Sequence, residues 1–272
     1  MGTRTPTAVN MRAVLFASAI LLFLCTHGCA TTTLPQAAQR KHVSEPQRWL
    51  STTVCFASAQ DAIQLLGAED EYTRRMSPLD RSLRVRTPMP VGTQEHLHHA
   101  SQAAVNWTTH EIAQWSPAIQ LIAEALHGLK IPLPDQIVLI RTNGDDELKA
   151  NYTRSHGIIL PRVPSSPTQT VQMVSLLAHE LFHIASRVGP TDFRDRMYEL
   201  AGFHRVSPGP MPAAFESRRL TNPDAYTHHH ALQVLSKSQG QVLVIPVLSS
   251  RLSRKELTRN TTLQRAVDLR LA

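Results

Sequence analysis

The chain has 272 residues, which is enough for one sizeable domain or two small ones with a hydrophobic core. Hydrophobic residues make up 42% of the chain, a share that is typical of a globular protein and excludes a disordered one. The net charge is +7, but the arginines are scattered and no recognised nucleic-acid-binding module accompanies them, so we expect no nucleic-acid partner.

The first 29 residues have the pattern of an export signal. Arg4 and Arg12 form a positively charged start, and residues 13–25 (AVLFASAILLFLC) form an apolar run. A membrane-spanning helix needs about 20 apolar residues, so this shorter run is more typical of a secretory signal. We therefore expect the protein to be exported into the envelope of a bacterial cell.

Cys29 is the predicted lipidation site. The pair Gly28-Cys29 directly follows the apolar run and resembles a bacterial lipobox, in which the cysteine becomes the lipidated N-terminus. Thr26 departs from the lipobox pattern, which has an aliphatic residue at this position. The alternative is ordinary cleavage after Ala30, without a lipid. A lipid on Cys29 would tether the protein to a membrane surface.

Residues 30–57 are predicted to be a tether, and residues 58–272 a single catalytic domain. The start of the tether is polar and contains Pro35 and Pro46. Once the signal is removed and Cys29 carries a lipid, Cys55 is the one free thiol of the mature chain. The sequence therefore excludes an intramolecular disulfide.

From residue 58 onwards, apolar periodicity and turn residues predict a mixture of helices and strands. The predicted helices cover 58–76 with a break near Gly67, 93–129, 168–188, and a last one that runs from Thr191 as its N-cap to Ala201. The prolines between 78 and 92 predict a loop-rich region. The predicted strands cover 137–140, 149–160 as a strand or hairpin ending at Pro161, and a C-terminal β-hairpin of 231–235 and 241–248. This order predicts an α+β fold.

The helix predicted at 168–188 contains the sequence His-Glu-Leu-Phe-His. His179 and His183 are four residues apart, so both imidazoles lie on one face of the helix and can reach one zinc ion. Glu180, next to the first histidine, can contact a zinc-bound water and act as its general base. The flanking residues are apolar, and burying such polar groups without a metal would cost about 1–3 kcal/mol each.

Several residues are candidates for the third zinc ligand. Glu199 follows His183 by 16 residues on the next predicted helix, and this somewhat short spacing favours it if the fold is that of a glutamate-type zincin. Glu216, the run 228–230 of three histidines, and Asp224, which follows a proline just before the hairpin, are further candidates. The spacing alone does not decide between them.

The HELFH helix resembles that of the zincin metallopeptidases. Together with Tyr152-Thr153-Arg154, the segment 158–161 (IILP) and the segment 221–225 (TNPDA), it looks like an uncharacterised group of bacterial lipoproteins with metallopeptidase-like sequences. The resemblance covers roughly residues 60–250 and implies a zincin-like domain. Its Asn-Pro-Asp segment favours Asp224 as the third ligand.

In zincins a strand before the active-site helix pairs with extended substrate, and residues 150–160 match this position. Tyr152 and Arg154 then either point into the cleft or pack across the strands. Tyr198, Tyr226 or a nearby histidine is expected to stabilise the oxyanion.

The predicted function is zinc-dependent hydrolysis of peptide bonds in the cell envelope, with His179, His183 and Asp224 as ligands and Glu180 as base. Two alternatives remain open. One is a zincin-like binding lipoprotein without turnover, which the intact Glu180 argues against. The other is a zinc amidase that acts on cell-wall peptides, for which a basic surface would suit an anionic polymer.

Overall fold

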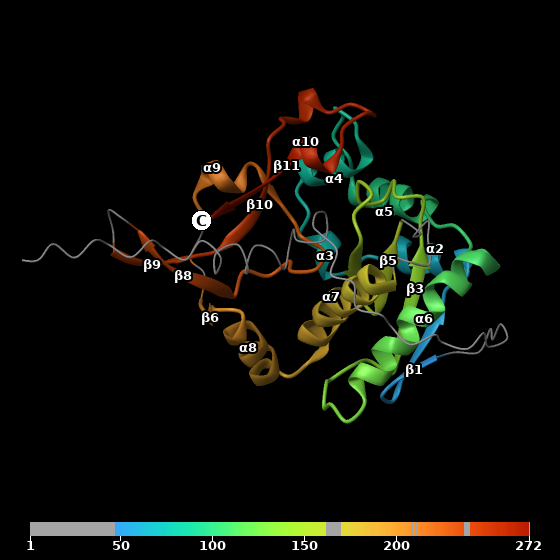
Figure 1. Cartoon of the computed structure of the whole chain (residues 1–272). Helices are drawn as coiled ribbons and strands as arrows, with labels where there is room; N and C mark the ends of the chain where they lie inside the picture. Colours follow the sequence, from blue (N-terminus) through green and yellow to red (C-terminus); the bar gives the residue numbers. More distant parts are fainter. Residues whose placement is uncertain (1–46, 162–169, 208, 210, 237–239, 272) are drawn as a thin grey trace, which may run out of the picture.

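The computed structural model describes residues 47–161, 170–207, 209, 211–236 and 240–271. The predicted export signal with Cys29, and residues 30–46 of the predicted tether, lie outside this part. The described chain contains one five-stranded sheet and two three-stranded sheets, and several helices lie around the five-stranded sheet (Figure 1). The prediction of an α+β fold is confirmed.

The five-stranded sheet has the order β1-β2-β3-β5-β4. Its strands are β1 (Gln47–Trp49), β2 (Thr52–Phe56), β3 (Gln136–Arg141), β4 (Tyr152–Arg154) and β5 (Gly157–Leu160). Strands β2, β3 and β5 are parallel, while β1 and β4 are antiparallel edge strands. The segment 149–160 is thus a β-hairpin that ends just before Pro161, as the sequence predicts.

The predicted C-terminal boundary of the tether is corrected by β1 and β2. The tether was expected to extend to residue 57, but residues 47–56 form two strands of the sheet. The side chain of Trp49 is fully buried, and its indole nitrogen donates a hydrogen bond to the Ile119 carbonyl at 2.9 Å. Burial of this large aromatic side chain holds the segment in the domain.

The helices α6 (Thr109–Leu126) and α7 (Thr170–Val188) cover one face of the sheet. Their apolar side chains form the main core with strand residues that alternate along the sheet, namely Ile137, Leu139, Ile158 and Leu160. Ile140 and Ile159, each next to one of these residues along its strand, face the opposite side and pack against α2 (Ala59–Gly67). Helix α5 (Thr93–Gln102) lies against α2.

The C-terminal part forms two small sheets, β11-β10-β7 and β6-β8-β9. Their strands are β6 (Phe203–Arg205), β7 (Arg219–Leu220), β8 (His230–Ser236), β9 (Gly240–Val244), β10 (Pro246–Ser250) and β11 (Val267–Leu271). The remaining helices are α3 (Glu71–Arg74), α4 (Pro78–Val85), α8 (Thr191–Leu200), α9 (Ala213–Glu216), the short 3-10 helix η2 (Arg254–Glu256) and α10 (Leu263–Ala266). Leu83 of α4 packs with Leu220 and Leu257, and this contact joins the first part of the chain to the last.

Four predicted boundaries differ from the structure. The helix expected at 93–129 is two helices, because Thr108 caps α6 in a capping box with Glu111. The region expected to be loops contains α4, which Ser77 caps. Thr191 is the first residue of α8 rather than its N-cap. The predicted hairpin is formed by β8 and β9, but its second strand ends before Pro246, where the chain enters another sheet.

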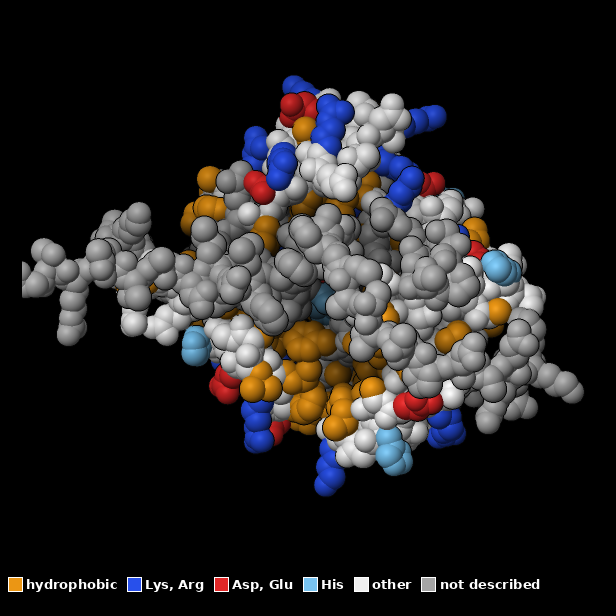
Figure 2. All heavy atoms as spheres, in the orientation of Figure 1, with side chains coloured by type: hydrophobic (Ala, Val, Ile, Leu, Met, Phe, Trp, Pro, Cys, Tyr) orange, Lys and Arg blue, Asp and Glu red, His pale blue; other side chains and the backbone are white. Residues whose placement is uncertain are grey.

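Hydrophobic side chains gather on the surface over the region of α7 and α8 (Figure 2). Large hydrophobic side chains that are exposed there include Val171, Val188 and Leu200. Within the described part of the chain, no helix combines the length and apolar character needed to cross a bilayer.

Candidate metal centre

Helix α7 brings the two motif histidines together. The Nε2 atoms of His179 and His183 are 3.0 Å apart, and the two rings stand nearly perpendicular to each other. Two imidazole nitrogens that bind one tetrahedral zinc ion at 2.0–2.1 Å are about 3.3 Å apart. The pair therefore already has nearly the separation that a shared zinc ion requires.

Asp224 reaches this site from the segment between β7 and β8. Glu180, His183 and Asp224 each offer one ligand atom, and these three atoms all lie within 4.8 Å of one another. Oδ1 of Asp224 accepts hydrogen bonds from the backbone N–H of Thr153 at 2.6 Å and from its hydroxyl at 2.8 Å. His179 is not one of these three residues, but its Nε2 atom lies 3.0 Å from Nε2 of His183.

The carboxyl group of Glu180 is shielded from solvent. Its side chain is buried, and Oε2 has no hydrogen-bond partner among the described residues. Burial raises the pKa of Glu180 well above its usual range, and the negative charge of Asp224 raises it further. Two carboxyl groups so close together are stable when a proton or a cation lies between them.

Both histidines are neutral at pH 7. Burial lowers the pKa of His183 to about 4, and burial also lowers the pKa of His179, against the opposing charge of Asp224. Neutral imidazole is the form that binds a metal ion. Nδ1 of His183 is buried and has no partner within the described chain.

Among the candidates for the third ligand, Asp224 is the residue that the structure brings to this group. Glu199 is exposed near the end of α8, and Glu216 forms an ion pair with Arg219. His230 contacts Asp195, with 2.9 Å between Nε2 and the carboxylate. His228 and His229 line a larger cavity, and His228 also lines the small cavity that contains His183.

Thr153 and Arg187 are site residues that the sequence analysis did not find. Arg187 lies one turn after His183 on α7, and it donates to the Thr153 hydroxyl at 2.7 Å, to the Ser155 carbonyl at 3.0 Å and to the Pro223 carbonyl at 3.2 Å. It thereby ties α7, the β4 hairpin and the Asp224 segment together. The alternation of side chains along β4 was the available signal for Thr153, since it places Thr153 on the opposite face of the strand from Tyr152 and Arg154.

Those two neighbours, Tyr152 and Arg154, face away from the metal centre and pack in the interior. The Tyr152 hydroxyl donates to Asp146 at 2.8 Å, and Nε of Arg154 donates to Asp70 at 2.7 Å. Of the two alternatives that the sequence left open for them, a place in the cleft or packing, the structure therefore favours packing. The backbone N–H of Thr153 is bound to Asp224, and the pairing of substrate with residues 150–160 stays a prediction.

A small cavity of about 100 Å³ lies directly beside His183. Its wall is largely apolar and aromatic, and includes Phe182, Tyr198, Phe203, Leu220 and Leu248. Tyr198 stacks on His230 with ring centroids 4.2 Å apart, so its ring is fixed in this wall. Of the two tyrosines expected to stabilise an oxyanion, Tyr198 shares this cavity with His183.

A buried ionic cluster fixes the start of the Asp224 segment. Arg84 of α4 bonds to Asp80, to Glu147 at 2.5 Å, and to the Thr221 carbonyl at 2.7 Å. The Thr221 backbone N–H donates to Asp80 at 2.8 Å. Tyr72 completes the cluster by a hydrogen bond to Glu147. Both backbone groups of Thr221, three residues before Asp224, are therefore held by buried charges.

Comparison with known proteins does not add to this description, since no protein-family model, curated protein or solved structure matches the chain.

Proposed function

We propose that the protein is a zinc-dependent metallopeptidase with a zincin-like site. The observation that carries this proposal is the grouping of four side chains. The Nε2 atoms of His179 and His183 are 3.0 Å apart, and one ligand atom from each of Glu180, His183 and Asp224 lies within 4.8 Å of the other two. A purely structural role gives no reason to gather two carboxyl groups and two imidazoles where water is largely excluded.

The donor set fits zinc. Imidazole nitrogen and carboxylate oxygen are ligands that zinc prefers, and the buried Oε2 of Glu180 lacks a partner among the described residues, as expected for a group that would face a cation and its water. His179, His183 and Asp224 would hold the ion, and Glu180 would remain free as the base. Zinc in such a site makes a water molecule acidic near pH 7 and polarises a carbonyl group.

The protein's own groups account for the movement of protons. Glu180 accepts the proton of the attacking water at its carboxylate and delivers it to the leaving amine nitrogen. A cation beside Glu180 favours its ionised form, which the buried carboxyl otherwise resists. The apolar cavity beside His183 would receive an apolar side chain next to the scissile bond.

The predicted signal and lipidation site support a location for this activity. With a lipid on Cys29, the domain would act on polypeptides close to a membrane of the bacterial envelope. A Cys29→Ser variant is expected to appear in the soluble fraction while the natural chain stays with the membrane fraction. Equal distribution of the two would count against the lipid anchor.

The deciding experiment compares the natural chain with Glu180→Gln. Both are expected to hold about one zinc ion per chain, because the substitution leaves the three ligands in place. Only the natural chain is expected to cleave peptides, and the variant to lose activity by at least about 100-fold. If neither form retains zinc, the proposal fails, and if the variant cleaves as fast as the natural chain, Glu180 is not the base.

A further inference from the structure

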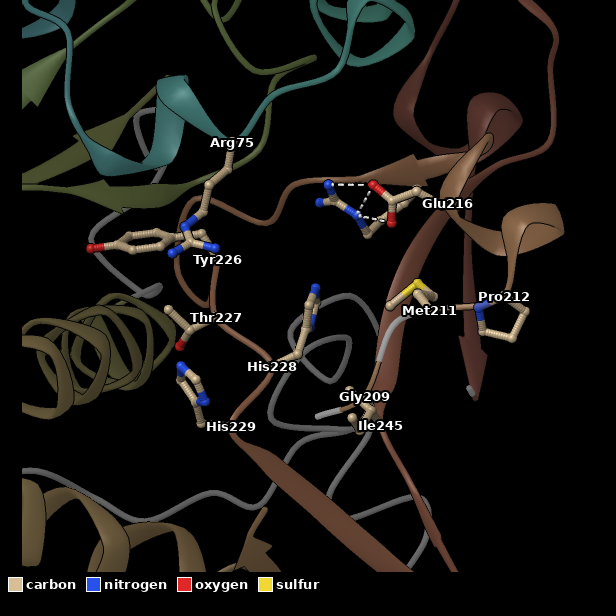
Figure 3. A pocket seen from close by; sticks show the side chains of 11 residues that line it. Arg75, Gly209, Met211, Pro212, Glu216, Tyr226, Thr227, His228, His229 and Ile245 are labelled. Atoms are coloured by element: carbon tan, nitrogen blue, oxygen red, sulfur yellow. Dashed lines mark hydrogen bonds and ion pairs between the residues drawn. The ribbon is translucent and has the colours of Figure 1, made fainter. Parts of the chain in front are cut away.

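A second, larger cavity of about 440 Å³ lies near the metal centre and carries basic side chains on its wall (Figure 3). Arg75 comes from the end of α3, Arg219 from β7, and His228 and His229 from the segment that leads to β8. None of these residues takes part in the reaction proposed above. The cavity therefore needs a separate explanation.

The two cavities share part of their walls. Thr227, His228 and Ile245 line both of them, and the smaller one also contains His183. His228 is four residues from Asp224, and a chain advances at most about 3.6 Å per residue, so the two Cα atoms are within about 14 Å. A peptide held at the metal centre can therefore reach the basic cavity with a group about four residues or fewer from the scissile bond.

The wall offers hydrogen-bond donors that are not in use. Arg75 binds Glu71 through Nε and Nη2, and within the described chain its Nη1 has no hydrogen-bond partner. The side chains of Thr227, His228 and His229 also make no hydrogen bond to described residues. Figure 3 shows the Arg75 guanidinium directed down beside Tyr226, toward the segment that carries Thr227 and His228.

The existing carboxylates leave this wall able to bind an anion. The ion pair between Arg75 and Glu71 is solvent-exposed, with side-chain exposures of 44% and 46%, and such pairs contribute little. Glu216 on the cavity wall is already bound by Arg219 through two of its guanidinium nitrogens. Burial lowers the pKa of His228, and the positive charges of Arg219 and Arg75 lower it further. The two arginine charges are therefore felt by a side chain on the cavity wall.

We propose that this cavity binds a carboxylate of the peptide substrate, so that the enzyme selects peptides with an acidic group within about four residues of the scissile bond. The inference rests on the proposed peptidase function. The carboxylate belongs to an Asp or Glu side chain or to the C-terminus of the peptide, and Arg75 is its principal ligand. Thr227, His228 and His229 supply further hydrogen-bond donors around it.

The test measures peptide binding without turnover. The full chain with Glu180→Gln is loaded with zinc and titrated with fluorescent octapeptides blocked at both ends, in which one Gln at a time is replaced by Glu, and with the neutral peptide carrying a free C-terminus. One of these carboxylate peptides is expected to bind about tenfold more tightly than the neutral one. The position that gives this gain identifies the source of the carboxylate.

Arg75 and Arg74 provide a matched pair of variants. Arg74 lies on the same short helix, pairs with Glu69 and Glu71, and is not part of the cavity wall. Arg75→Gln is expected to remove the preference for the carboxylate peptide, and Arg74→Gln to retain it. The inference is overturned if no carboxylate peptide is preferred, or if Arg75→Gln keeps the preference.

Hydrolysis by the natural chain separates the two proposals. Cleavage of peptides without any carboxylate preference would overturn this inference alone. A carboxylate preference that depends on Arg75, in a protein that cleaves none of the peptides, would overturn the peptidase proposal alone.

Discussion

The hydroxyl group of Thr153 links Asp224, the proposed third ligand, to its support. It donates to Asp224 at 2.8 Å and accepts from Arg187 at 2.7 Å, and the residue itself is fully buried. A metal ligand held by two hydrogen bonds keeps one orientation. The position of Asp224 therefore depends on a residue that would not itself touch the metal.

Replacing Thr153 with valine should weaken zinc binding. The substitution keeps the shape of the side chain but removes the hydroxyl, so the affinity for zinc is expected to fall by roughly 10–100-fold. Thr153→Ser is the control, because it retains the hydroxyl and should bind zinc almost normally. Competition with a chromogenic chelator measures both affinities. Unchanged affinity in Thr153→Val would show that this hydroxyl does not support a ligand.

Asp224 itself can be tested against the other candidates for the third ligand. Asp224→Asn is expected to reduce zinc affinity by more than about 100-fold, since it removes a charged ligand rather than its support. Glu199→Gln and Glu216→Gln should have no effect, because neither carboxylate reaches the group around His183. The same chelator competition decides this, and a large loss in Glu199→Gln would contradict the assignment.

The sequence predicted the part of the site that is local. His179, Glu180 and His183 share one helix, so their spacing is enough to bring them together. Asp224 was favoured by a resemblance and not by spacing. The contacts of Thr153 and Arg187 could not be predicted, because they join residues that are 32 to 71 positions apart in the chain, and alternation along β4 indicates only on which face Thr153 lies.

At the scale of single elements, α5 carries a buried histidine that is a source of acid sensitivity. His96 is 2% exposed, and burial together with the nearby charges of Arg84 and Arg154 lowers its pKa to about 3. In the unfolded chain the same group has a pKa near 6.5. Between these values the unfolded state binds a proton that the folded state does not, so the folded state loses stability as the pH falls.

Because of His96, the free energy of unfolding should fall by about 1.4 kcal/mol for each unit that the pH is lowered between about 6.5 and 3. His96→Gln is expected to remove this pH dependence. Urea unfolding at pH 5 and pH 7 would then give two free energies of unfolding that differ less than those of the natural chain. His98→Gln is the control, because His98 lies on the same helix and is exposed. If both variants keep the natural pH dependence, His96 is not its source.

The boundaries of the elements were predicted less well than the elements themselves. A proline-rich stretch was expected to be a loop, yet Pro78 is compatible with the first turn of a helix and Ser77 caps it. Residues 47–56 lie in the sheet because Trp49 and Val54 are buried against α6 and the strands. Burial by distant parts of the chain overrides local composition in such cases.

For the whole molecule, the candidate metal centre joins two parts that are separate in the chain. His179 and His183 belong to α7, which packs on the large sheet, while Asp224 belongs to the segment after β7. A ligand that binds only the folded state stabilises all of it. Zinc at 100 times its dissociation constant should therefore raise the free energy of unfolding by about 2.7 kcal/mol.

Urea unfolding with zinc and with a chelator measures this gain. Asp224→Asn should show little of it at the same zinc concentration, whereas Glu180→Gln should show most of it, because Glu180 is not expected to be a ligand. A natural chain that unfolds at the same urea concentration in both conditions would contradict the zinc proposal.

The fold class could be predicted because it depends on the type and order of elements, and both are local properties. The sheet order β1-β2-β3-β5-β4 could not, because it depends on which distant strands pair. The pairing of β2 with β3 joins residues about 80 positions apart, and no local pattern encodes it.

The Thr221 contact also has a consequence for the time course of folding. Its backbone N–H is bound by Asp80, 141 residues earlier in the chain, and Leu220 beside it packs with Leu257. The Asp224 segment therefore cannot take its final position on a growing chain until nearly all of the protein has been synthesised. The two histidines of α7 can form their helix much earlier. The metal centre would then be completed last, and a partly made chain would offer two of the three proposed ligands.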